Sequence, residues 1–250
     1  PLLHYFADAD LTALKSDADY IYFTAPLIKT ASYPFAWIWP MFIAAVLIFA
    51  GLLFYGFKKR RLKVEDVLKG YIPILFSILA SLIVGFLLWE IIKMINPEYG
   101  EMLHGFTYNG HTYIKAYAFI GLGICFWIYS RFYKPGNTAS LLVAPISIWL
   151  LLCLVFGMKL KGASFFIIPV FFALISLFVL INQRKPSLIL MALISFPLLM
   201  IMSPFIKMFP VGLGFFMDIG VAEITVKLVS LLMIALMFGL LISIFGFFIY

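Results

Sequence analysis

Glu90 and Lys93 are a pair of residues whose types and spacing would allow chemistry near a membrane. Three residues apart on a helix, a carboxylate and an ammonium group lie on the same face and can form an ion pair. Inside a membrane, such a pair would be a candidate proton or ion site. At the end of a membrane span its role is structural, because the lysine extends toward the lipid headgroups. Both residues lie at the end of an apolar run, so we favour the structural interpretation.

Histidine and glutamate side chains gather in the polar and aromatic stretch 94–113, which contains His104, His111, Glu98 and Glu101. Glu101 and His104 have the i, i+3 spacing found in some helical metal sites. However, the glycines and the proline of this stretch disfavour a regular helix, and its tyrosines favour a belt at the membrane surface. The candidates for a polar site at the membrane edge are Glu90, Lys93, His104 and His111.

Motifs of catalytic and cofactor sites are absent from the sequence: it has no G-x-S-x-G, H-E-x-x-H, C-x-x-C or Walker phosphate loop. Cys125 and Cys153 lie in apolar runs, which predicts buried thiols and neither a disulfide nor a zinc site. The four aspartates between positions 8 and 19 lack the glycine and the late glutamate of a calcium loop. We therefore expect no catalytic residue, bound cofactor or metal ligand in this chain.

Composition points to a lipid environment. Of the 250 residues, 65% are hydrophobic and 12% are charged, whereas soluble domains are about half apolar and about one-quarter charged. The formal net charge is +7, but the basic residues lie between apolar runs and do not form one basic face. This distribution is typical of charges that set membrane topology, and it excludes a nucleic-acid partner in favour of the lipid bilayer.

Long apolar segments are the elements that must position these residues. A helix needs about 20 apolar residues to cross about 30 Å of hydrocarbon. Seven segments meet or approach this length, at 35–57, 71–92, 112–129, 139–158, 162–182, 186–206 and 228–250. The glycine-rich segment 207–223 between the last two is expected to be interfacial or re-entrant. The sequence therefore predicts an all-α, polytopic transmembrane helix bundle of about seven spans.

Orientation follows from the basic residues beside the spans. The loop 58–69 contains six lysines and arginines, more than any other loop, and is predicted to be cytoplasmic. The N-terminus and the stretch 94–113 then lie outside the cytoplasm, in the periplasm or in a lumen. By alternation, the basic loops at 131–134 and 184–185 fall inside, whereas the lysines at 159–161 fall outside.

The segment from Leu2 to Pro34 reads LLHYFADADLTALKSDADYIYFTAPLIKTASYP. It resembles the junction between the two domains of membrane-bound zinc metallopeptidases of the vacuolar membrane protease and endoplasmic-reticulum metallopeptidase type. In that family an aminopeptidase-like domain ends in a helix, and a segment of the D-x-V-Y-F kind leads into a multi-span membrane domain. Residues 2–10 are similar to the end of that helix, and residues 19–23 are similar to the segment before the first span.

This resemblance implies that residues 1–34 are an extracytoplasmic linker after a catalytic domain encoded before Pro1, and that residues 35–250 anchor this domain in the membrane. The family binds two zinc ions through an H-x-D motif, a Glu-Glu pair, further aspartates and a final histidine. This chain has no H-x-D and no Glu-Glu pair, so zinc is expected only in the upstream domain. The expected partners are the bilayer, the upstream peptidase domain and its peptide substrates.

Two other classes of protein fit the same sequence. The prolines of the segment 186–206 and the glycines that follow are also typical of a transporter or permease-like bundle, in which helices are broken. A non-catalytic scaffold or sensor subunit would need no motif at all. The residues alone leave these alternatives open.

Overall fold

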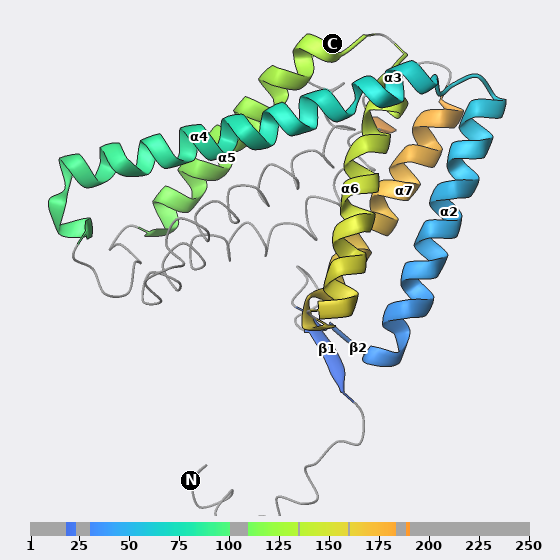
Figure 1. Ribbon diagram of the computed structural model, residues 1–250, viewed down its shortest axis with the longest axis horizontal. Coiled ribbons are helices and arrows are strands. Elements are labelled where there is room, and N and C mark those ends of the chain that lie inside the picture. Colours follow the sequence, from blue (N-terminus) through green and yellow to red (C-terminus); the bar gives the residue numbers. More distant parts are fainter. Residues whose placement is uncertain are drawn as a thin grey trace, which may run out of the picture.

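The structure, a computed structural model, describes residues 19–23, 31–100, 110–134, 136–159, 161–183 and 189–190. Within these ranges the chain is mostly helical, and its helices form two groups (Figure 1). One group is a bundle of α2 (Ile38–Lys58), α6 (Thr138–Lys159) and α7 (Ile167–Asn182). The other is the pair α4 (Tyr71–Ile95) and α5 (Gly110–Phe132), which leans away from the bundle. A short two-stranded sheet lies at one end of the bundle.

The sheet is an antiparallel hairpin of β1 (Tyr20–Phe23) and β2 (Ala31–Pro34). Its register pairs Tyr20 with Pro34 and Phe23 with Ala31. Sequence reasoning treated this region as a linker, and the hairpin was not predicted. The all-α description therefore needs a correction at the N-terminal side of the first span.

The bundle is built from three long apolar helices. The short helix η2 (Phe35–Trp37) leads directly into α2 (Ile38–Lys58). Helix α6 (Thr138–Lys159) is followed by the short helix η4 (Lys161–Phe166) and by α7 (Ile167–Asn182). Because η4 reverses the chain between them, α6 and α7 are antiparallel neighbours, and α2 packs against both.

The second group begins with the short helix α3 (Val64–Lys69), which continues after Gly70 into α4 (Tyr71–Ile95). The turn η3 (Pro97–Gly100) follows α4, and α5 (Gly110–Phe132) runs back beside α4. One link from α4 to the bundle is a hydrogen bond of 2.7 Å between the hydroxyl groups of Tyr71 and Ser147.

Within the part of the chain that the structure describes, four helical segments are long and apolar enough to cross a membrane: Phe35–Lys58, Val64–Ile95, Thr138–Lys159 and Ser164–Asn182. They correspond to the first, second, fourth and fifth predicted spans. The third predicted span lies within α5, of which Phe119–Phe132 counts as a shorter apolar helix. The sixth and seventh spans and the segment 207–223 lie outside the described residues, so the total of about seven stays a prediction.

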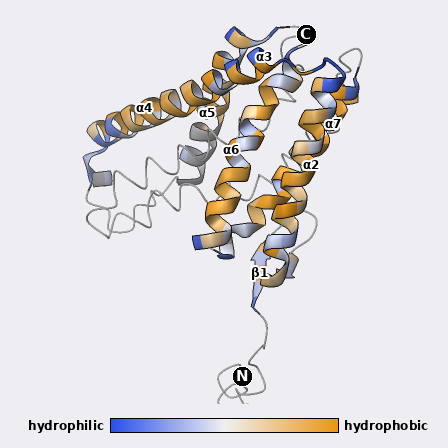
Figure 2. Cartoon of the chain, turned by 45° about the vertical axis from the view of Figure 1, so that its right-hand side comes forward, coloured by the Kyte–Doolittle hydropathy of each residue, from blue (hydrophilic) through white to orange (hydrophobic). Residues whose placement is uncertain are grey.

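Apolar side chains cover the outside of these helices as well as their inside. Figure 2 shows hydrophobic residues along most of the length of α2 and α4, and large side chains such as Leu47, Phe54 and Leu75 are exposed. A helix that is hydrophobic on all sides is suited to lipid, because water would leave its outer face unfavourably solvated.

Helix α2 ends in a compact cap around Gly56. The amide of Arg61 donates to the carbonyl of Gly56 at 3.0 Å, and the amide of Arg60 donates to the carbonyl of Phe57 at 3.0 Å. Arg60 has a φ of 56°, which completes a Schellman motif. The side chain of Leu62, 3% exposed, then folds back over Gly56. The cap therefore directs the basic loop across the end of the helix.

Replacing Gly56 by alanine is expected to destabilise the protein by about 1–3 kcal/mol, because a Cβ would overpack this cap. That atom would lie 2.5 Å from Cδ1 and 2.7 Å from Cγ of Leu62. Gly51→Ala in the same helix is the matched control, since a Cβ there meets no atom within 4 Å. Unfolding measured in mixed micelles would show the difference, and equal stability of the two variants would contradict the packing argument.

Candidate functional site

The end of the bundle where α2 and α7 finish carries most of the charge of the described residues, and we call it the charged end (Figure 1). Its basic residues are Lys58, Lys59, Arg60, Arg61, Lys63, Lys69, Arg131 and Lys134. Its acidic residues are Glu65 and Asp66. The excess of positive charge is typical of the side of a membrane protein that faces the cytoplasm and its anionic lipids.

Hydrogen bonds from Asn182 hold two helices together at the charged end. Its Oδ1 accepts from the Tyr55 hydroxyl and from the Lys59 ammonium group, each at 2.8 Å. Its Nδ2 donates to the carbonyl of Phe178 at 2.8 Å, and Lys59 lies 4.5 Å from the centre of the Tyr55 ring. The last turns of α2 and α7 are therefore level with each other, as two spans in the same direction require.

Two loops that are far apart in the sequence also meet at this end. Helix α3, in the basic loop, packs against α6, which follows the loop 131–134. Gly70, at the end of α3, lies against Ser140 and Leu141 near the start of α6. The loops 58–69 and 131–134, both predicted to be cytoplasmic, thus lie on one side of the molecule.

The opposite end of the bundle holds the β1–β2 hairpin. Ile21 is 1% exposed, and the ring of Phe23 stacks on that of Phe165 in η4, with 6.3 Å between centroids. The Tyr33 hydroxyl is buried, which raises its pKa above the usual value, so this side chain stays neutral. The hairpin is therefore attached to the helices by apolar contacts and is not a free linker.

Its attachment continues into the bundle through a cluster of aromatic rings. Phe165 and Phe166 have centroids 4.7 Å apart, and Phe166 lies 5.3 Å from Trp149 and 5.4 Å from Phe156 in α6. Rings at such distances add to the free energy of burial. The hairpin, η4 and α6 thus form one packed unit.

Glu90 and Lys93 form the ion pair that their spacing predicts, with 2.7 Å between Nζ and Oε1. Both side chains are partly exposed and lie near the end of α4. This position fits a helix-end pair. The charged residues of the described apolar helices all lie toward helix ends, and none lies near the middle of its helix.

The structure does not describe a site formed by the two candidate histidines. His104 lies outside the described residues, and His111 belongs to the first turn of α5, but its side chain is not among those that the structure describes. Within the described ranges, no three histidine, cysteine or acidic side chains group as metal ligands. Cys125 and Cys153 are free and buried, as predicted.

Sequence reasoning missed the hairpin and its docking surface. The segment Tyr20–Phe23 is rich in aromatic and β-branched residues, and this signal could have identified a strand. Its partner, Ala31–Pro34, contains a proline and a serine and carries no such signal.

Together, the fold and the charged end define a mostly helical protein with candidate membrane spans and a small hairpin at the opposite end. Comparison of the chain with protein-family models, with curated protein sequences and with solved structures gave no match. The class of the protein therefore rests on its own residues and geometry.

Proposed function

We propose that this chain is the membrane domain, with about seven spans, that anchors a zinc-dependent peptidase domain on the side of the membrane where β1 and β2 lie. The observation that carries the proposal is the attachment of the hairpin at the end of the bundle opposite the charged end. A flexible tether would let a preceding domain tumble freely. A hairpin packed on η4 instead fixes the point from which residues before Asp19 depart.

The orientation of the charges supports the same proposal. With the charged end in the cytoplasm, the hairpin lies at the periplasmic or lumenal surface. The resemblance of residues 2–34 to the junction of membrane-bound zinc metallopeptidases gives the chemistry of the domain to be anchored. In this proposal the chain itself supplies no zinc ligand and no catalytic group. It holds the active site at a constant height above the bilayer and so favours membrane-proximal peptides.

The test is the coding sequence before Pro1 together with the zinc content of the full-length polypeptide. We expect H-x-D and Glu-Glu motifs in that sequence, bound zinc in the purified protein, and aminopeptidase activity that a chelator abolishes. A variant with alanine in place of the histidine and aspartate of the H-x-D motif should lose both zinc and activity but keep its place in the membrane. If the preceding sequence encoded neither motif, the proposal would be wrong.

A further inference from the structure

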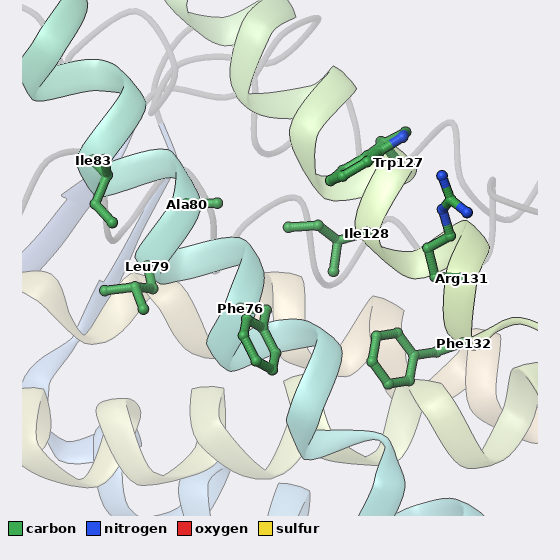
Figure 3. Close-up of a pocket in the computed structure, with 8 residues that line it drawn as sticks. All are labelled: Phe76, Leu79, Ala80, Ile83, Trp127, Ile128, Arg131 and Phe132. Atoms are coloured by element: carbon green, nitrogen blue, oxygen red, sulfur yellow. The ribbon is translucent and has the colours of Figure 1, made fainter.

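The pair α4 and α5 encloses an open groove of about 420 Å³ (Figure 3). Phe76 and Ile83 of α4 and Trp127 and Phe132 of α5 belong to its walls. Ala80 and Ile128 point toward each other across it. Apart from Arg131 the lining is apolar, so the groove suits a hydrocarbon and not a water-soluble ligand.

Arg131 is the charged member of this lining. Its guanidinium group lies 5.4 Å from the centre of the Trp127 ring, which holds it beside the groove through a cation–π contact. No carboxylate of the described residues pairs with it, and its side chain is exposed. An exposed guanidinium group without a carboxylate partner presents its N–H donors in a planar fork that matches phosphate oxygens.

The position of Arg131 sets the level of the groove in the membrane. It lies in the last turn of α5, at the charged end, and Lys134 follows it in the sequence. The basic residues of this end belong at the headgroups, and the apolar walls extend from there along α4 and α5. A phosphate at Arg131 and a tail along the groove therefore match the two parts of one lipid molecule.

We propose that the groove between α4 and α5 binds a phospholipid with an anionic headgroup, whose tail packs on Phe76 and Trp127 and whose phosphate pairs with Arg131. Charge complementarity favours this occupant, because the charged end attracts the anionic lipids of the cytoplasmic leaflet. A second transmembrane helix fits less well. Helices approach each other closely over small residues, whereas Ala80 is the one small residue in this lining.

The test compares lipid retention by the purified protein after reconstitution with equal amounts of phosphatidylglycerol and phosphatidylcholine. After gentle extraction, bound lipids are counted by native mass spectrometry. We expect the unmodified protein to retain phosphatidylglycerol preferentially and Arg131→Gln to lose about fivefold of this preference, the effect of one basic residue at an anionic surface. Lys134→Gln is the control for the general positive charge of this end, because this lysine is outside the groove lining. It should lose clearly less of the preference than Arg131→Gln, and an equal loss would show that no specific contact with Arg131 is involved.

A second variant tests the groove itself. Ala80→Leu, which fills the gap opposite Ile128, should lower the retention of both lipids at this site, with Arg131 still present. Equal preference in Arg131→Gln and the unmodified protein would overturn the proposal. Unchanged lipid retention in Ala80→Leu would also overturn it. A change of oligomeric state in Ala80→Leu without loss of lipid would overturn it too, because it would identify another protein segment as the occupant. These outcomes do not depend on a peptidase domain.

Discussion

Replacement of Trp149 by alanine is expected to lower the free energy of unfolding by about 3–5 kcal/mol, the usual cost of removing a large aromatic side chain from a packed core. Trp149 is 0% exposed and lies 5.3 Å from Phe166, in the aromatic cluster that joins α6 to η4. The cavity left behind cannot close easily, because α2 and α7 both pack against α6. Equilibrium unfolding in mixed micelles would measure the loss.

Leu151→Ala is the matched control for this variant. Leu151 lies in the same helix but is 63% exposed, on the surface that the lipid covers. Its truncation leaves no cavity, so the expected loss is below about 1 kcal/mol. Similar losses for Leu151→Ala and Trp149→Ala would show that burial in this bundle does not determine stability.

The Trp149 variant should also loosen the hairpin, since Phe166 and Phe165 connect this side chain to Phe23. A single cysteine introduced by Ile21→Cys, at a position that is 1% exposed, in a background without Cys125 and Cys153, would report this change through faster labelling. Faster labelling at position 21 with an unchanged rate at a site in the charged end would show that the effect is local. Unchanged labelling at position 21 would mean that the hairpin is held by other contacts.

Neutralising the basic loop is the second change with a large expected effect. The substitutions Lys58→Gln, Lys59→Gln, Arg60→Asn, Arg61→Gln and Lys63→Gln remove five of the eight positive charges of the charged end. Asparagine is chosen at position 60 because it tolerates the positive φ of 56° found there. Since lysine and arginine beside short loops set topology, we expect a mixed or inverted population in place of a single orientation.

The substitution Asp66→Cys places a cysteine in the basic loop, and labelling of this cysteine in intact cells or sealed vesicles measures the orientation. In the unmodified loop this cysteine should react only after the membrane is permeabilised, and in the neutralised loop a large fraction should react from outside. The control is Lys159→Gln with Lys161→Gln, which removes charge at the opposite end and should leave the orientation unchanged. Labelling from outside with all basic residues present would contradict the predicted orientation.

Local features of this protein could be predicted from its sequence. The bounds of α2, α4, α6 and α7 follow closely from apolar runs, because crossing a bilayer requires about 20 apolar residues whatever the rest of the chain does. The Glu90–Lys93 ion pair could be predicted in the same way, because a spacing of three residues on one helix brings the two side chains close together. The buried, free thiols of Cys125 and Cys153 also followed from their apolar neighbours.

Features that join distant segments were decided by the tertiary structure. β1 becomes a strand because it pairs with Ala31–Pro34 and packs on η4. The four residues of β1 do not by themselves indicate either of these partners. Arg131 gains its position in the groove because α5 runs back along α4, and Asn182 joins α2 because the two helices end at one level. Hydrophobic runs determine which segments are helices, but the contacts of one helix with another depend on shape, and a single segment does not contain that information.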